Sequence, residues 1–282
     1  GWIINSSGER WPDVGQGGGN LKLSKSANGH MFIPLHFWFC RNPGLALPLI
    51  ALQYHEVKVK MTIEELKNLA FKVTRTGAAP GTVIGTLASP TTVTEPPASE
   101  KSFDLWCDYI YLDTDERRRF AQVSHEYLIE QLQYKPSNGG TITLDFNHPV
   151  KEIIWSGVRK TTGDKKPELY KKNPLFNSSS DTIILKLNGQ DRFEERNIRY
   201  FTRTQIWQHH TGYGSTYPVG DEIAVYSFAL KPEEHQPSGT CNFSRIDAAE
   251  LIQSAAKAVE VYAINYNILR IMSGMGGLAY SN

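Results

Sequence analysis

The chain has 282 residues, 40% of them hydrophobic and 21% charged, which is enough apolar material for one large or two ordinary domains. Lys and Arg total 30 against 29 for Asp and Glu, so no general positive field would attract nucleic acid or anionic lipid. Aromatic residues make up 11% of the chain and accompany 23 Gly and 15 Pro, a composition that favours strands joined by turns. We therefore expect an all-β protein that makes no direct contact with nucleic acid.

The first part of the chain alternates between loops and strand patterns. Residues 1–30 are rich in Gly, Ser and Asn and predict a loop, whereas the apolar run 31–39 predicts a strand buried on both faces. Residues 45–52 favour one or two helical turns, and the strict alternation in 57–63 predicts a half-buried strand. Prolines interrupt the apolar stretch from 31 to 52, so it does not predict a membrane-spanning helix.

A capping-box pattern at Thr62 and Glu65 predicts a short helix to about Lys72. The stretch 74–102 is dense in Thr, Pro, Gly and Ser and predicts a long surface loop with a strand at 82–87. Apolar residues then alternate through 103–111 and predict another strand.

The charged run 113–119 is interpreted as a short solvated helix that links two domains. Beyond it, residues 127–134 fit either a helix or a strand. Helix propensity alone favours a helix at 248–258, and 158–181 reads as a polar surface loop. The segments with clear strand patterns are 142–146, 183–187, 223–230 and 259–272. The dipeptide Asn188-Gly189 directly after one of them predicts a tight hairpin turn.

The three cysteines, Cys40, Cys107 and Cys241, are far apart in the sequence and contain no C-x-x-C pair. This spacing predicts neither a disulfide framework nor a zinc knuckle, so we expect reduced, buried thiols.

Motifs that could carry chemistry are weak. The glycines of 274–279 fit a loose dinucleotide fingerprint, but too few residues follow to form the helix that this site needs; we expect a Gly-rich arm packed closely on a neighbour. We place His209 and His210 on a strand, where adjacent side chains project to opposite faces, and therefore predict no metal site there. Asp113 and Asp115 have nearby arginines to neutralise them and do not predict a cation site. No G-x-S-x-G, H-E-x-x-H or P-loop occurs, so we expect no enzyme activity, cofactor or metal, although a triad assembled in space stays open.

Three N-x-S/T acceptors, at Asn5, Asn177 and Asn242, are candidate glycosylation sites. Their number is near the chance expectation for a chain with so many Asn and Ser residues. Asn177 lies in the most polar surroundings of the three.

Seven phrases occur in an order that resembles the major capsid protein of the nucleocytoplasmic large DNA viruses, the family of the algal-virus and iridovirus coats. They are 43–57 (PGLALPLIALQYHEV), 112–117 (LDT followed by ER), 119–122 (RFAQ), 125–132 (HEYLIEQL), 187–193 (LNGQDRF), 237–247 (PSGTCNFSRID) and 265–280 (NYN, then LRIMSGMGGLAY).

The resemblance implies a double jelly roll, two antiparallel eight-stranded β-sandwiches, three copies of which form a pseudo-hexagonal trimer that tiles an icosahedral shell. On this mapping, residues 1–116 are the C-terminal part of the first jelly roll and 117–282 the second. The N-terminal part of the first jelly roll is absent from the sequence, which starts at Gly1 without a Met or a secretory-signal pattern, so we expect a fragment.

The implied partners are the other two copies in a homotrimer, neighbouring capsomers, and penton and minor capsid proteins. The implied location is the virion capsid, near an internal membrane without insertion, after assembly in the cytoplasm of the infected cell. The alternative is a jelly-roll carbohydrate-binding module that stacks sugars on Trp2, Trp11, Trp155 or Trp207, which predicts a concave face with clustered aromatics. A cupin-type enzyme is less favoured, since the clustered metal ligands it needs are missing.

Overall fold

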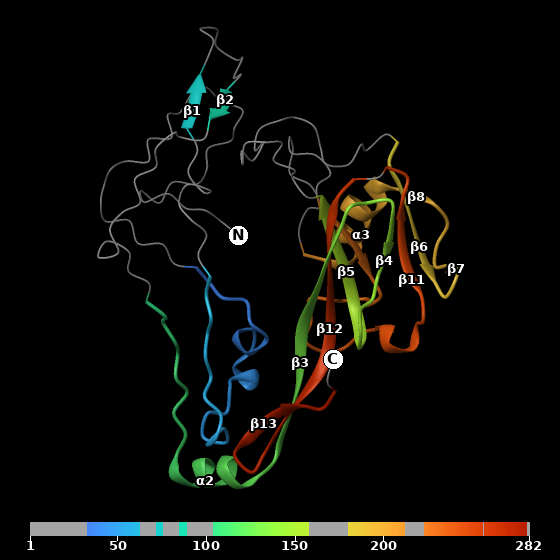
Figure 1. Cartoon of the computed structure of the whole chain (residues 1–282). Helices are drawn as coiled ribbons and strands as arrows, with labels where there is room; N and C mark the ends of the chain where they lie inside the picture. Colours follow the sequence, from blue (N-terminus) through green and yellow to red (C-terminus); the bar gives the residue numbers. More distant parts are fainter. Residues whose placement is uncertain are drawn as a thin grey trace.

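A computed structural model describes residues 33–62, 72–75, 85–88, 104–157, 180–211, 223–255 and 257–280. Most of the described residues after 124 belong to two antiparallel sheets that face each other, and a two-stranded ribbon of β1 (Lys72–Arg75) and β2 (Gly85–Ala88) stands apart from them (Figure 1). The fold is therefore mostly β, as the composition predicts.

The first sheet is organised around one long strand. Its members are β3 (His125–Ser137), β5 (Pro149–Gly157), β9 (Ile223–Ser227), β10 (Cys241–Asn242), β12 (Val259–Met272) and β13 (Met275–Leu278). β12 pairs with β3 along one edge, while its other edge pairs first with β5 and then with β13. β5 in turn pairs with β9 and β10, so the order across the sheet is β3-β12-β5-β9.

The second sheet is shorter. It contains β4 (Thr141–Thr143), β11 (Ala249–Gln253), β6 (Thr182–Leu187), β7 (Gln190–Asp191) and β8 (Arg196–Asn197), in the order β4-β11-β6 with β7 and β8 both paired to β6. The chain passes from one sheet to the other between β3, β4, β5 and β6, and again between β8 and β9 and around β11. This alternation is the connectivity of a jelly roll.

The core lies between the two sheets. Trp155 of β5 is fully buried, and its ring centroid is 5.4 Å from that of Phe201 in the π-helical turn η4 (Tyr200–Thr204). Aliphatic side chains at alternate positions of β6, β11 and β12 fill the space around them. Because these strands alternate buried and partly exposed residues, one face of each sheet is dedicated to the core.

The strand predictions for the second half are confirmed in their essentials. The ambiguous segment 127–134 is part of β3, and β6 and β12 occupy the predicted 183–187 and 259–272. β4 covers only the start of 142–146, and β9 ends at Ser227, before the predicted end at 230.

Asn188 and Gly189 have φ angles of 51° and 77° and form the predicted hairpin turn between β6 and β7. The helix predicted at 248–258 is wrong. This segment contains β11, because pairing with β4 and β6 buries its alternate side chains and outweighs helix propensity.

The predicted solvated helix is confirmed as α2 (Thr114–Gln122), whose residues are largely exposed. Asp113 caps it, with its carboxylate accepting a hydrogen bond of 2.9 Å from the Glu116 amide. α2 joins residues 104–113 to β3 at the bottom of Figure 1.

Three strands predicted in the first half are not found in the described residues. Residues 33–39, 57–62 and 104–111 carry no β-pairing, and most of their apolar side chains are exposed; a short 3₁₀ turn, η1 (Trp38–Cys40), ends the first segment. Alternation indicates that a segment could cover a core, but a strand also needs a neighbour to bond its backbone, and these segments have none among the described residues.

Other predictions for the first half are met in part. The helical tendency at 45–52 appears as the turn η2 (Pro43–Leu45) and the amide hydrogen bonds of residues 51 and 52 to Pro48. β2 overlaps the predicted strand at 82–87. It lies within the predicted loop 74–102, whereas β1 only reaches the start of that loop. Residues 1–32, most of the predicted helix 62–72, and 158–179 lie outside the described residues.

Cys40 and Cys107 are exposed and Cys241 is half-buried, all three with free thiols. The prediction of buried thiols is wrong for the first two because they belong to the segments without sheet partners. None of the helices in the described ranges is both long and apolar enough to cross a bilayer.

Candidate functional site

The outer face of the first sheet carries an apolar strip. The register sets Leu132 opposite Ile264 and Tyr134 opposite Tyr262, with Ile154 of β5 beside Tyr262. These residues alternate with the core-facing ones, so their side chains point away from the sandwich, and Leu132 and Tyr134 are exposed. The face therefore presents apolar surface where a sheet in contact with water normally carries polar residues.

At one end of the strip, a carboxylate holds the two tyrosine hydroxyls by hydrogen bonds. The two tyrosine rings lie 5.1 Å apart, and both hydroxyls donate to Glu260, Tyr134 at 3.2 Å and Tyr262 at 3.0 Å. An apolar surface fixed by aromatic rings with polar tips is typical of protein interfaces.

A second set of exposed apolar side chains lies before α2. Trp106 is 83% exposed and Tyr111 90%, and the remaining members are Leu105, Tyr109 and Ile110. Solvent contact of this many large apolar groups is unfavourable, so a surface of this kind usually meets a partner.

The hairpin of β12 and β13 contacts the chain near residue 54 through hydrogen bonds of its backbone groups. The Tyr54 amide donates to the Gly274 carbonyl at 2.9 Å, and the Gly276 amide donates to His55 Nδ1 at the same distance. A Cβ on Gly274 would come within 2.5 Å of the Tyr54 ring, so the contact needs glycine there. The close packing expected of this Gly-rich segment is observed within the chain, in a hairpin, and packing of an arm on a neighbouring copy stays a prediction.

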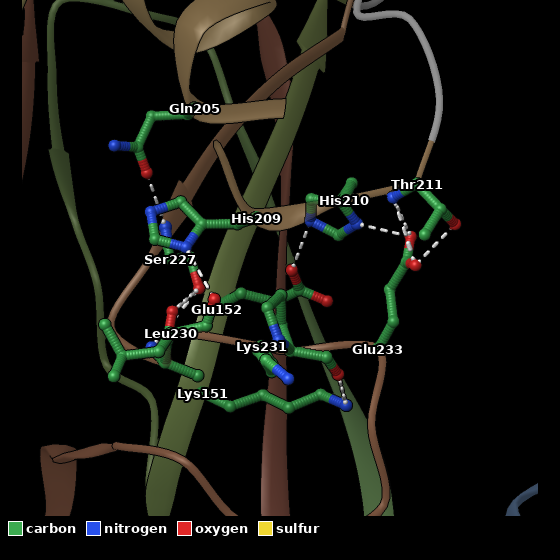
Figure 2. Close-up of polar contacts among 12 residues, drawn as sticks. Lys151, Glu152, Gln205, His209, His210, Thr211, Ser227, Leu230, Lys231 and Glu233 are labelled. Atoms are coloured by element: carbon green, nitrogen blue, oxygen red, sulfur yellow. Dashed lines mark hydrogen bonds and ion pairs between the residues drawn. The ribbon is translucent and has the colours of Figure 1, made fainter. Parts of the chain in front are cut away.

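A buried polar cluster lies on the same outer face (Figure 2). Val150 pairs with Asn265 and Glu152 with Ile264, which leaves Lys151 without an opposite residue in a β-bulge. Lys151 is only 1% exposed, and its Nζ donates to Glu130 at 2.7 Å and to the Pro232 carbonyl at 2.6 Å. The bulge thereby places two consecutive charged residues of β5 within reach of partners.

The cluster extends to its surroundings through Glu130 and Tyr266. Arg41 forms an ion pair with Glu130, which joins the first part of the chain to β3. The Lys151 ammonium lies 5.7 Å from the centre of the Tyr266 ring. Burial, with the nearby Glu130 and Glu152, raises the pKa of Tyr266 to about 12, so this hydroxyl stays protonated.

His210 lies between two carboxylates. Its Nε2 is 2.9 Å from Glu152 Oε2 and its Nδ1 is 3.1 Å from Glu233 Oε1, while Thr211 donates to Glu233 from both its amide and its hydroxyl. Contact with Glu152, supported by the charge of Glu233, raises the pKa of His210 against the opposing effect of its partial burial. Burial acts to raise the pKa of Glu233, but the hydrogen bonds from Thr211 and His210 outweigh it and lower that pKa.

The prediction that His209 and His210 lie on a strand is wrong. His209 ends the helix α3 (Gln205–His209) and His210 caps it, and both rings face the turn after β9, with Leu230 as the partner of His209 at 3.0 Å. In the ranges with described coordinates, no three His, Cys, Asp or Glu side chains are arranged to hold a metal ion. The charges of this cluster are engaged with one another, an arrangement that organises structure.

A pocket of about 240 Å³ adjoins the cluster. Trp38, Arg41 and Asn42 line it from the first part of the chain, Leu128 and Glu130 from β3, and Glu233 and His235 from the turn after β9. No sequence motif pointed to this pocket, because its walls come from segments about 90 to 200 positions apart.

Two family models match successive parts of the chain. Residues 116–277 match the model of the large eukaryotic DNA virus major capsid protein, and residues 20–113 match that of the major capsid protein N-terminus. The chain belongs to the large eukaryotic DNA virus major capsid protein family. The resemblance inferred from seven sequence phrases is thus confirmed, and the family is one of structural proteins and not of enzymes.

Relatives in this capsid family align over most of the chain. The major capsid protein of Pyramimonas orientalis virus is 51% identical over 275 residues, covering 89% of this chain and 61% of the relative. That of Paramecium bursaria Chlorella virus 1 is 38% identical over 317 residues, covering 91% and 68%. The chain thus spans about two thirds of the length of the curated relatives it matches.

Solved structures agree with this assignment. The crystal structure of PBCV-1 VP54, fitted into a reconstruction of the virophage Sputnik, matches with a TM-score of 0.64 at 35% identity, covering 89% of this chain and 70% of VP54. The quasi-atomic model of the PBCV-1 virus capsid matches with a TM-score of 0.63. The predicted class, an all-β double jelly roll, is therefore confirmed.

The glycosylation candidates have different surroundings. Asn242 is exposed in β10, but its side-chain oxygen accepts a hydrogen bond from the Ser244 amide and caps the turn η5 (Phe243–Arg245). Ser244 is the third residue of this N-x-S sequence, and its hydroxyl accepts a hydrogen bond of 2.8 Å from the His148 amide. Asn5 and Asn177 lie outside the described residues, and glycosylation stays a prediction for all three.

The carbohydrate-binding alternative loses one of its tryptophans. Trp155 is fully buried in the core and cannot stack on a sugar, whereas Trp207 on α3 is 76% exposed. Trp2 and Trp11 lie outside the described residues. No concave aromatic platform emerges in the part of the chain that is described.

Proposed function

We propose that this chain is a shell-forming major capsid protein of a large DNA virus. The observation that carries the proposal is its 51% identity over 275 residues to the major capsid protein of Pyramimonas orientalis virus. The likeness to the quasi-atomic model of the PBCV-1 virus capsid supports it at the level of structure. The work of such a protein is geometric, because association of folded subunits replaces chemistry on a substrate.

The assembly unit that we propose is a trimer of pseudo-hexagonal outline. Each copy contributes one jelly roll from 117–282 and a second one to which residues 1–116 belong. The start of α2 at Thr114, directly after the apolar segment 104–111, supports a boundary at this point. Three copies with two similar sandwiches each give six similar lobes around a closed threefold axis.

The exposed apolar surfaces support association as the function. Both the strip around Tyr134 and the segment around Trp106 would gain free energy by leaving water, at about 25 cal/mol per Å² of buried apolar area. We propose that these surfaces meet other copies in the trimer, neighbouring capsomers, or penton and minor capsid proteins. The near-zero net charge supports a role without direct nucleic-acid contact.

The family assignment supports the location that we propose. The protein would lie in the virion capsid after assembly in the cytoplasm of the infected cell. There it would lie near an internal membrane without inserting into it.

Native mass spectrometry and negative-stain electron microscopy of the purified chain test the proposal. We expect a particle of three subunits with a hexagonal outline. A monomer that persists at high protein concentration would argue against shell assembly by this chain.

Surface variants then identify the contacts. Leu132→Arg and Trp106→Arg each place a charge on an exposed apolar surface, and at least one should shift the trimer toward monomer. Thr143→Arg is the matched control, because Thr143 is exposed on the second sheet. Trimers unaffected by either apolar-surface variant would contradict the roles assigned to these surfaces.

A further inference from the structure

The turn that follows β9, residues 230–235, is fastened to the sandwich by polar contacts (Figure 2). Lys151 donates to its Pro232 carbonyl, and Glu233 accepts from Thr211, at 2.6 Å from the hydroxyl and at 3.1 Å to each carboxylate oxygen from the amide. His210 connects this turn to Glu152 on β5. Its position between two carboxylates makes His210 the contact in this group that depends most on protonation.

We propose that His210 is a pH-sensitive latch, which ties the 230–235 turn to β5 as an imidazolium and releases it when the ring loses its proton. Carboxylate oxygens only accept hydrogen bonds, so a ring with a carboxylate at each nitrogen needs a proton on both. A neutral imidazole carries one proton and can serve one carboxylate at a time. The Nδ1 contact with Glu233 at 3.1 Å has hydrogen-bond geometry, and Nε2 lies at ion-pair distance, 2.9 Å, from Glu152 Oε2, so this arrangement favours the charged ring.

Charged groups on the described elements around the ring set this dependence. Glu152 faces the ring from β5 and Glu233 faces it from the turn, while Lys151 is engaged by Glu130 of β3, which also binds Arg41. On the exposed side of the turn, Lys231 pairs with Glu234 at 2.9 Å, and the neighbouring His209 binds the Leu230 carbonyl. Loss of the proton from His210 would leave the buried Glu152 carboxylate without its cationic partner. An uncompensated buried charge is costly, so the closed turn becomes less stable.

The sign of the pH dependence follows from the direction of the shift. The pKa of His210 is raised above 6.5 in the folded protein, so the latch is fully closed below pH 6.5 and opens as the pH rises through the raised value. At the acidic end, the lowered pKa of Glu233 keeps the latch intact until the pH falls below 4.5 and through that lowered value.

Opening of the latch would alter the pocket described above. Glu233 and His235 line it from the turn, and Trp38 and Arg41 line it from the first part of the chain. Release of the turn therefore loosens a place where the first part of the chain meets the sandwich. This inference is independent of shell formation, because it concerns contacts within one chain.

Hydrogen exchange followed by mass spectrometry on the full chain tests the latch between pH 5.5 and 8.5, with exchange times scaled for the intrinsic pH dependence of amide exchange. The reporters are the Thr211 amide, which donates to Glu233, and the Lys231 amide, which donates to Ser238. We expect their protection to fall as the pH rises through the raised pKa of His210. In His210→Gln the protection should be low at every pH and independent of it.

Two further variants complete the design. His235→Gln is the matched control from the same turn and should keep the pH dependence of the parent protein. Glu233→Gln should move its midpoint to lower pH, and this variant decides the case if His210→Gln disturbs the exchange of β12. Parent and His210→Gln proteins with the same pH profile, or a profile lost in His235→Gln, would overturn the proposal.

Discussion

Substitution of Gly274 probes the contact between the β12–β13 hairpin and the segment around Tyr54. Gly274 has a φ of 80°, and a Cβ there would lie 2.5 Å and 2.9 Å from two atoms of the Tyr54 ring and 3.3 Å from the Gln53 Cβ. Gly274→Ala should therefore combine backbone strain with a clash.

Two other glycines separate these effects. Gly189 has a φ of 77° with open space around its Cβ position, so Gly189→Ala should cost only the strain of a left-handed residue, about 1 kcal/mol. Gly277 has no neighbour within 4 Å of that position and no positive φ, so Gly277→Ala should change the free energy of unfolding by less than about 0.5 kcal/mol. Gly274→Ala should lower the free energy of unfolding by about 2 kcal/mol. The Tyr54 ring must move, and loss of the hydrogen bond from the Tyr54 amide contributes about 1 kcal/mol in addition to the backbone strain.

Urea unfolding of the three variants measures the differences, and hydrogen exchange at the Tyr54 amide locates them. We expect that amide to lose protection in Gly274→Ala and to keep it in Gly189→Ala and Gly277→Ala. Equal losses for Gly274→Ala and Gly189→Ala, with Tyr54 still protected, would show that the hairpin contact contributes nothing beyond its own backbone geometry.

Three further predictions concern the core, the buried cluster and the division of the chain. Trp155→Ala should lower the free energy of unfolding by about 3–5 kcal/mol and Trp207→Ala by less than about 0.5 kcal/mol, as measured in urea; similar values would place Trp155 outside the core. Lys151→Met leaves Glu130 with Arg41 as its cationic partner and should cost about 3 kcal/mol, whereas a neutral result would mean that water compensates this carboxylate. Residues 117–282 expressed alone should unfold cooperatively and 1–116 alone should lack protected amides, and a sharply folded 1–116 would refute this division.

Local signals in the sequence were sufficient for much of the second half. Apolar alternation in 183–187 identified β6, and the strand pattern of 259–272 identified β12. Asn188-Gly189 identified the hairpin, because its two positive φ angles suit few other residues. The charged run after residue 112 gave α2, with Asp113 as its cap. In each case the information lay within a few positions of the element that it predicted.

The buried cluster could not be predicted in this way. Lys151 reaches its partners only because β5 gains a residue relative to β12, and nothing in the sequence near residue 151 marks that bulge. Glu130 meets Arg41 across 89 positions, and His210 meets Glu152 across 58. Such pairs depend on register and on the crossing of elements, which composition and periodicity do not encode.

The failures in the first half have another cause. Apolar alternation at 57–62 and 104–111 correctly marks side chains that favour burial, but it carries no information about which strand would lie alongside. Tertiary pairing decides whether such a segment becomes a strand.

The length of β12 has a mechanical consequence. This strand pairs with β3 along Val259–Ile271. Its far end continues through Gly274 into the hairpin that forms hydrogen bonds with residues 54 and 55. A force applied at this contact along the strand would act in shear on the inter-strand hydrogen bonds of the β12–β3 pair. These hydrogen bonds would then share the load and resist it together. β12 would therefore transmit tension from the segment around Tyr54 to the first sheet of the sandwich.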